Sequence, residues 1–170
     1  MNLDLVIIGG GASGYMAAIT AAANGLRSVV ILESTLKVLE KVRISGGGRC
    51  NLTNSCSEIS DLVNNYPRGE KQLIGLFNQF STNDAYDWFE RRGLRLKVEK
   101  DGRVFPFSDS SYDVINCLKD LADDSGIKVF TNSHVKEISK SNEGFNLLVK
   151  GNKSIESKNI LICTGGHSSG

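Results

Sequence analysis

Three glycines near the start of the chain have the spacing of a dinucleotide-binding turn. Gly9, Gly11 and Gly14 form the pattern G-x-G-x-x-G, and the acid Glu33 follows 19 residues after the third glycine. The first glycine allows a tight turn, the second lets the backbone approach a pyrophosphate, and the third lets a helix pack close to a strand. A carboxylate at this distance can accept both ribose hydroxyls of an adenosine, and it would repel a 2′-phosphate. These residues predict a dinucleotide site and leave FAD, NAD and S-adenosylmethionine open.

A second glycine-rich stretch runs from Lys41 to Asn54 and combines three kinds of residue that suit a polar or anionic ligand. The glycines are Gly46, Gly47 and Gly48, the basic residues are Lys41, Arg43 and Arg49, and the polar residues are Ser45, Asn51, Thr53 and Asn54. Glycines let the backbone come close to a ligand. The stretch suits a pyrophosphate or the pyrimidine end of a flavin, where a cation stabilises the anionic reduced form. A mobile glycine-rich linker is the alternative.

Two cysteines in and after this stretch, Cys50 and Cys56, raise the possibility of a redox dithiol. Neighbouring arginines could lower the pKa of the Cys50 thiol and so activate it. Disulfide reductases of this fold carry Cys-x4-Cys, whereas five residues intervene here. A thiol that packs in the core or beside a flavin is the simpler interpretation.

The two histidines, His134 and His167, have no metal-ligand spacing with the cysteines, so we predict no metal site. His167 follows a glycine pair and could act as an acid or base near a flavin. The pattern assigns no catalytic residue.

The elements that must position these residues alternate between strand and helix. Buried strands are predicted at 3–8 and 28–32 with a helix at 13–24 between them, followed by a long loop at 34–56. The remaining prediction is helices near 69–80 and 83–92 (the second capped by Asn83), a hairpin of 94–98 and 103–105, a helix at 111–124, a strand at 127–130, an antiparallel meander of 135–139, 145–150 and 153–156, and a last strand at 159–163. This order predicts an α/β fold in which a parallel sheet carries an antiparallel β-meander.

Composition restricts the class of protein. The chain has 170 residues, about one domain, with 20 Lys and Arg against 19 Asp and Glu and a net charge of +1. A nucleic-acid partner is not expected, because the basic excess typical of such binders is missing. No apolar run approaches the roughly 18 residues of a membrane helix, and no basic region precedes the apolar start, so we expect a cytoplasmic protein whose cysteines are thiols.

Four motifs in this chain resemble one family, the BaiN/YhiN-like flavoproteins, also described as aminoacetone-oxidase-family FAD-binding enzymes. The matching stretches are Val6–Gly14, Ile44–Asn54, Gly102–Pro106 with Ser108 and Asp109 after it, and Thr164–Ser168. The resemblance runs along essentially the whole chain, and the Ser-Gly-Gly-Gly-Arg-Cys-Asn block is specific. The chain departs from the family at Leu39, where a glycine is usual, and at Glu40, which replaces a basic residue.

The resemblance implies a Rossmann-like FAD-binding domain of the glutathione-reductase type spanning 1–170, from which the substrate domain and the C-terminal segment that closes over the flavin are missing. It implies that a backbone group near Val135 meets the adenine and that the turn at Thr164 passes beside the pyrophosphate. The expected cofactor contacts are Gly9, Gly11, Ala12, Ser13, Gly14, Glu33, Ser34, Lys41, Ser45, Gly46, Gly47, Arg49, Asn51, Val135, Thr164, Gly165 and Gly166.

The expected activity is that of an FAD-dependent oxidoreductase acting on a small molecule. Hydride would pass from NAD(P)H through the flavin to an unsaturated or carbonyl compound, with the protein orienting and tuning the cofactor. The alternatives are a flavin amine oxidase that uses O₂, a non-catalytic or inactive nucleotide-binding fragment, and a flavin enzyme acting on tRNA, which the absent basic excess disfavours. The sequence does not fix the substrate or the oligomeric state.

Overall fold

The computed structural model describes residues 2–166 and divides the chain into two compact units. Unit 1 comprises residues 1–42 and 118–170, and unit 2 comprises residues 43–117. Among the described residues, no helix has both the length and the apolar character needed to span a membrane.

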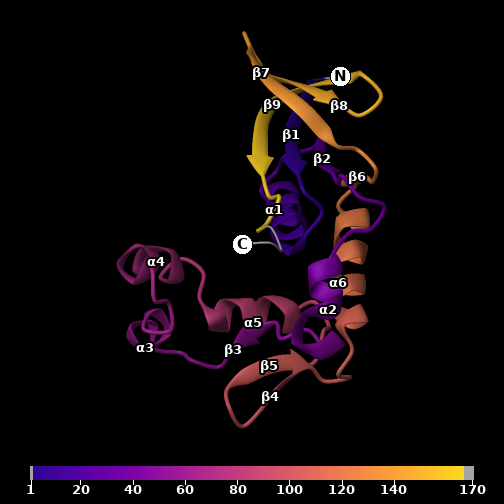
Figure 1. The fold of residues 1–170 in the computed structure, drawn as a ribbon. Helices are drawn as coiled ribbons and strands as arrows, with labels where there is room; N and C mark the ends of the chain where they lie inside the picture. Colours follow the sequence, from indigo (N-terminus) through magenta and orange to yellow (C-terminus); the bar gives the residue numbers. More distant parts are fainter. Residues whose placement is uncertain (1, 167–170) are drawn as a thin grey trace. The chain divides into compact units, whose positions relative to one another are not determined.

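Unit 1 is built on a six-stranded sheet with the order β6-β2-β1-β9-β8-β7. The strands are β1 (Asn2–Ile8), β2 (Val29–Leu32), β6 (Lys128–Phe130), β7 (Val135–Ser141), β8 (Gly144–Val149) and β9 (Lys153–Ile162). Neighbours among β6, β2, β1 and β9 are parallel, whereas β8 pairs antiparallel with both β9 and β7. Helix α1 (Ala12–Ala23) connects β1 to β2 beside the sheet (Figure 1). The predicted α/β fold with a parallel sheet and an antiparallel meander is confirmed.

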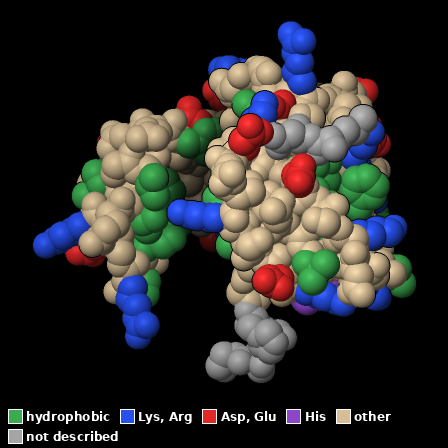
Figure 2. Space-filling model, turned by 90° about the horizontal axis from the view of Figure 1, so that it is seen from above, with side chains coloured by type: hydrophobic (Ala, Val, Ile, Leu, Met, Phe, Trp, Pro, Cys, Tyr) green, Lys and Arg blue, Asp and Glu red, His purple; other side chains and the backbone are tan. Residues whose placement is uncertain are grey.

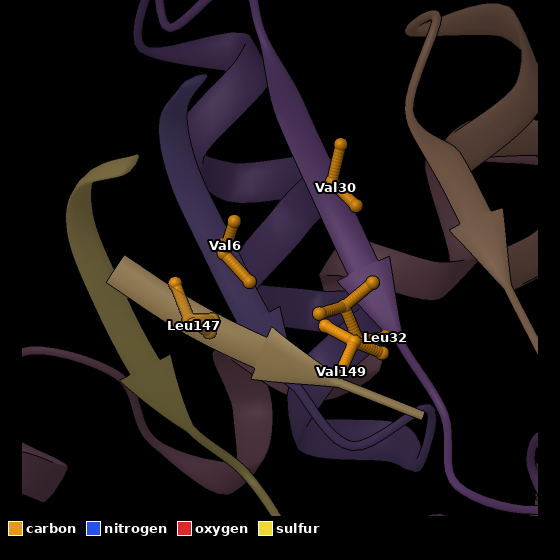
Figure 3. Packing of buried hydrophobic residues seen from close by; sticks show 5 residues of the cluster. All are labelled: Val6, Val30, Leu32, Leu147 and Val149. Carbon is orange, nitrogen blue, oxygen red and sulfur yellow. The ribbon is translucent and has the colours of Figure 1, made fainter. Parts of the chain in front are cut away.

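The core of unit 1 lies where the meander covers one face of the parallel strands. Val6 of β1 and Val30 and Leu32 of β2 pack with Leu147 and Val149 of β8, as Figure 3 shows, and all five are at most 4% exposed. Burial of each such side chain contributes about 1.5–3 kcal/mol relative to an exposed one. Alternate residues of a strand point to opposite faces, which leaves Ile7 on the face that α1 covers.

Strand β9 differs from the prediction, which placed two strands at 153–156 and 159–163. The structure has one strand whose first half pairs antiparallel with β8 and whose second half pairs parallel with β1. The polar residues in its middle suggested a break, but they are anchored. Lys158 Nζ lies 2.8 Å from Asp4 Oδ1, and the Asn159 side chain donates to the Asp4 carbonyl at 3.1 Å.

Unit 2 holds a small antiparallel sheet with the order β3-β5-β4 and several short helices. Its strands are β3 (Thr53–Asn54), β4 (Leu96–Val98) and β5 (Arg103–Pro106), and its helical elements are η1 (Ser45–Gly48), α3 (Ile59–Val63), α4 (Glu70–Phe77) and α5 (Thr82–Glu90). Helices α2 (Glu40–Ile44) and α6 (Ser111–Asp124) each cross the division between the units. The predicted hairpin and the helix at 111–124 are confirmed.

Two details of unit 2 correct the sequence prediction. Residues 34–56 are not one irregular loop, because α2, η1 and β3 lie within them, and α3 was not predicted. Helix α5 is capped by Ser81 and not by Asn83. The Ser81 hydroxyl accepts from the Asp84 backbone N–H while the Asp84 carboxylate accepts from the Ser81 N–H, a capping box in which Asp replaces the usual Glu.

Candidate functional site

The first and third glycines of the turn after β1 are required by the packing of the chain itself. Gly9 has φ +117°, and a β-carbon on it would lie 2.3 Å from the Cys163 carbonyl oxygen at the end of β9. A β-carbon on Gly14 would lie 2.0 Å from the Gly9 carbonyl oxygen. Neither distance can be tolerated, so these two glycines let β1, α1 and β9 meet closely.

The second glycine differs, because no neighbour in the protein requires it. Gly11 has φ −87° and ψ −174°, which any residue adopts, and a β-carbon on it would meet no described heavy atom within 4 Å. Gly11 is also the N-cap of α1 and offers no side chain to the first turn. The initial N–H groups of a helix have no partner within the helix, and the helix dipole places positive potential there. Gly11 and the exposed Ala12 and Ser13 therefore border an open cradle suited to an anion.

Glu33 closes the other side of this cradle at the end of β2. Its Oε2 accepts from the Gly10 backbone N–H at 2.8 Å, and its Oε1 accepts from the Thr35 N–H at 2.8 Å and the Ser34 hydroxyl at 3.2 Å. Burial alone would raise the pKa of Glu33, but these hydrogen bonds outweigh it and hold the pKa below its ordinary value. The carboxylate is therefore ionised at neutral pH. It has about four acceptor sites, so capacity for a ribose hydroxyl remains.

Val135 begins β7 close to this acid. The Ser133 N–H donates to the Glu33 carbonyl at 2.7 Å, so the segment that enters β7 runs beside the end of β2. The Val135 side chain is partly buried against the core, and its backbone pairs with Val149. The start of β7 therefore lies near the end of β2 in unit 1.

Lys41 and the turn after β9 also meet. Lys41 Nζ donates to the Gly166 carbonyl at 2.5 Å, and a β-carbon on Gly165, whose φ is +70°, would lie 3.6 Å from that nitrogen. Thr164 directly follows Cys163, whose carbonyl touches the Gly9 turn. A cation and a glycine-containing backbone turn therefore lie beside the end of the parallel strands. His167 lies outside the described residues.

The backbone conformation of Leu39 shows how the chain accommodates one departure from the family pattern. It has φ +59°, the left-handed region that favours glycine, although its side chain is only 1% exposed. Its N–H donates to the Gly10 carbonyl at 2.8 Å. The chain therefore follows the path that a glycine allows, and the burial of the leucine side chain offsets a backbone cost of about 1–2 kcal/mol.

The second glycine-rich stretch lies in unit 2 and forms a tight left-handed turn. Gly46, Gly47, Gly48 and Cys50 all have positive φ, between +56° and +88°, and the Cys50 N–H closes the turn on the Ser45 carbonyl at 3.0 Å. A β-carbon on Gly46 would lie 2.7 Å from the Asn51 backbone nitrogen, whereas one on Gly47 would meet nothing within 4 Å. Gly46 is thus required by packing, and Gly47 faces open space.

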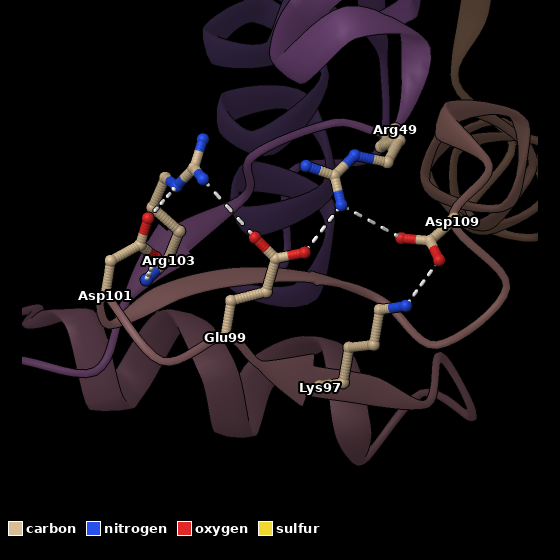
Figure 4. Close-up of polar contacts among 6 residues, drawn as sticks. All are labelled: Arg49, Lys97, Glu99, Asp101, Arg103 and Asp109. Carbon is tan, nitrogen blue, oxygen red and sulfur yellow. Dashed lines mark hydrogen bonds and ion pairs between the residues drawn. The ribbon is translucent and has the colours of Figure 1, made fainter.

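Arg49 is held by a network of charges, drawn in Figure 4. Its Nη1 lies 2.6 Å from Glu99 Oε1 and 3.4 Å from Asp109 Oδ1, and its guanidinium carbon lies 4.0 Å from the centre of the Phe105 ring. The network continues from Asp109 to Lys97 and from Glu99 through Arg103 to Asp101. The hydrogen bond with Glu99 raises the pKa of Arg49. Three cations face three carboxylates, so the network carries no net charge.

The structure favours the packing interpretation of Cys50 over the activated-thiol alternative. Burial raises the pKa of the Cys50 thiol above its ordinary value, because a thiolate is poorly solvated there, although a hydrogen bond with Ser45 opposes the shift. Cys50 is 5% exposed, and Cys50 and Cys56 are both free thiols in this structure. The Cys56 sulfur instead lies 3.6 Å from the Glu58 carbonyl oxygen.

The acidic partners of Arg49 were missed by sequence reasoning. Glu99 and Asp109 stand 50 and 60 residues after it, and neither lies in the glycine-rich stretch. The available signal was the third family motif, in which Phe105 and Asp109 occur together. On the face shown in Figure 2, Lys and Arg side chains are interspersed with Asp and Glu and form no single basic area.

The sequence of this chain is similar to those of two characterised proteins. The 3-dehydro-bile acid delta(4,6)-reductase of Clostridium scindens is 32% identical over 160 residues, covering 94% of this chain and 38% of that protein. The ribosomal RNA dihydrouridine synthase of Escherichia coli is 29% identical over 167 residues, covering 98% of this chain and 40% of that protein. The chain thus spans about two fifths of the length of these curated relatives.

Solved structures share the fold at low sequence identity. The open conformation of a flavocytochrome c3 fumarate reductase matches with a TM-score of 0.75 and 20% identity, over 97% of this chain and 34% of that one. A 3-ketosteroid-delta4-(5alpha)-dehydrogenase from Rhodococcus jostii RHA1 matches with a TM-score of 0.73 and 15% identity, over 97% and 46%. A family model described as the HI0933-like protein Rossmann domain matches residues 3–170, and the chain belongs to this family.

Proposed function

We propose that this chain binds FAD and that unit 1 holds the ADP half of the cofactor. The observation that carries the proposal is the open cradle at Gly11, where a glycine is present although no protein atom requires it. A pyrophosphate would fill this space and accept from the N–H groups that begin α1. The ionised Glu33 would accept from the ribose, and the segment at Val135 would lie along the adenine. Lys41 would add a positive charge on the side of Gly165.

We further propose that the complete protein is an FAD-dependent oxidoreductase that transfers hydride from NAD(P)H to an unsaturated or carbonyl compound. FAD, when bound, would supply two-electron redox chemistry. The residues of this chain would bind and orient the cofactor. The reductase name of the 32% identical relative supports an organic acceptor.

The test of cofactor binding is a titration of the purified chain with FAD, followed by visible absorption and flavin fluorescence. Gly11→Ala should weaken binding at least tenfold, because the added methyl group occupies the place of the pyrophosphate, and Glu33→Ala should weaken it by loss of the ribose contact. Gly75→Ala in α4 is the control, since that glycine has open space and no positive φ. A chain that binds no FAD, or binds it equally well as Gly11→Ala, would refute the proposal.

The electron donor is tested on the FAD-loaded protein without oxygen. Bleaching of the flavin by NADH or NADPH supports the reductase, whereas bleaching by an amine and not by a nicotinamide would favour the amine oxidase. Failure of every donor would favour a binding module without catalysis.

We propose a small molecule as substrate, no nucleic-acid or membrane partner, and a cytoplasmic location. The balanced charge and the interspersed signs in Figure 2 support the absence of a nucleic-acid partner, and four free cysteines fit a reducing compartment. One relative is named for ribosomal RNA, so the direct test is a gel-shift titration with ribosomal RNA fragments. Binding that weakens steeply with salt would overturn this part of the proposal.

A further inference from the structure

We propose that Arg49 is a positioning residue that holds the glycine turn Ser45–Cys50 in its left-handed path, and that it does not serve as a cation for the cofactor. The inference concerns unit 2 alone. Its consequence for FAD rests on the function proposed above and on the contact between this turn and the cofactor that the family resemblance implies. It corrects the interpretation of Arg49 as a direct cofactor contact.

The first support is the occupancy of the guanidinium. Arg49 Nη1 lies within hydrogen-bond distance of Glu99 and Asp109, and the flat face of the group rests on Phe105. Charge-assisted hydrogen bonds to carboxylates and stacking on an aromatic ring are the strong contacts of arginine. The network as a whole carries no net charge, so the positive charge of Arg49 is balanced by carboxylates of the protein.

The second support is Phe105, which joins the arginine to the turn. The ring is fully buried, and its Cε1 would lie 2.8 Å from a β-carbon on Gly46. The same ring carries the Arg49 guanidinium at 4.0 Å. One ring thus contacts the turn at its start and supports the side chain that leaves it at its end. Both contacts restrict where the turn can lie on β5.

The third support is the unfavourable backbone of the turn, which needs external support. Three glycines and Cys50 have positive φ, while Arg49 between them has φ −91° and ψ −19°. Glycine loses more conformational freedom on ordering than any other residue, so such a turn is not stable by itself. The anchors around it are the Cys50–Ser45 hydrogen bond, the Leu52 N–H bond to the Val104 carbonyl at 2.9 Å, and the charge network.

Hydrogen exchange of the Cys50 and Leu52 amides tests the positioning role without any cofactor. The variants are Arg49→Met, Glu99→Gln and Asp109→Asn. Each should speed exchange of both amides at least tenfold while amides of β1 and β2 keep their protection. Arg91→Met is the matched control, because it removes an exposed Arg–Asp pair elsewhere in unit 2. Unchanged exchange in all three variants would overturn the inference, and a circular dichroism spectrum checks that each variant is folded.

FAD titration then separates positioning from direct charge. Glu99→Gln and Asp109→Asn remove negative charge, so an arginine that contacted the cofactor would bind it as well as before or more tightly. If Arg49 is a positioning residue, FAD affinity should instead fall at least tenfold in all three variants. Arg49→Lys should not restore it, because an ammonium group cannot stack on Phe105 or make the two-pronged contact of a guanidinium. Equal or tighter binding in the two carboxylate variants would overturn the inference. A parent chain that binds no FAD would refute the proposed function, and the exchange result would still decide the role of Arg49.

Discussion

The two glycine-rich turns of this molecule obtain their shape in different ways. In unit 1, Gly9 and Gly14 let the backbones of β1, α1 and β9 touch, so the turn is fixed by main-chain packing. In unit 2, the turn at Gly46 is fixed by an aromatic ring and by a network of charged side chains. Each turn also contains one glycine that faces open space, Gly11 in the first and Gly47 in the second. Packing accounts for Gly9, Gly14 and Gly46 and a left-handed backbone for Gly47, whereas neither accounts for Gly11.

Gly14→Ala is the substitution that we expect to destabilise the first turn most. The added methyl group would lie 2.0 Å from a backbone oxygen, which no rotamer change relieves. We expect a loss of more than about 3 kcal/mol in the free energy of unfolding, at the upper end of overpacking effects. Gly11→Ala should change that free energy by less than about 1 kcal/mol. Urea unfolding of both variants measures the difference, and equal losses would contradict the division of roles.

In the second turn, we expect the same difference between a packed glycine and an open one, with smaller losses in the free energy of unfolding. Gly46→Ala meets both a left-handed backbone cost and contacts under 3 Å, for a total loss of about 2–3 kcal/mol. Gly47→Ala meets only the backbone cost, about 1 kcal/mol. The unfolding midpoints of the two variants in urea test the order. If Gly47→Ala proves the more harmful, the ring of Phe105 is not the constraint that we describe.

The smallest expected effect is on the stability of the fold at acidic pH, through the carboxylate of Asp4. The Asp4 carboxylate accepts from Lys158 and Ser28, and these bonds hold its pKa well below the ordinary value. A lowered folded-state pKa contributes stability above the unfolded pKa of about 4, and that contribution is lost as the pH falls toward the folded value. Asp4→Asn should therefore lower the thermal midpoint at pH 7 and reduce its fall between pH 4 and pH 2. A parallel fall in variant and parent would show that Asp4 is not responsible.

The sequence predicted the features that depend on local pattern. Apolar runs located β1 and β2, and the spacing of three glycines located the turn and the start of α1. Features that depend on distant partners could not be predicted. Lys158 and Asn159 suggest a strand break in the sequence, because their contacts with Asp4 are visible only in the structure. Arg49 likewise suggests an unpaired cation, because Glu99 and Asp109 lie far from it in sequence.

In the candidate site, too, local sequence pattern was predictive and burial was not. The glycine spacing placed Gly9 and Gly11 at the end of β1 and Glu33 at the end of β2, because parallel strands bring their ends to a common edge. The burial of Cys50 agrees with the packing interpretation, whereas the charges nearby in sequence could not indicate it. Leu39 shows that a left-handed position can be kept without glycine when the side chain is buried.

Strand β9 has a consequence for how the chain folds. Ile8, just before the nucleotide turn, pairs with Ile162, so the site cannot be completed until nearly the last described residues have been synthesised. Contacts of such high sequence separation slow folding and leave strand edges exposed in the meantime. The β1–α1–β2 segment emerges from the ribosome before β9, so one edge of β1 has no partner strand until β9 follows. A nucleotide that binds the finished turn would therefore select chains that have completed this pairing.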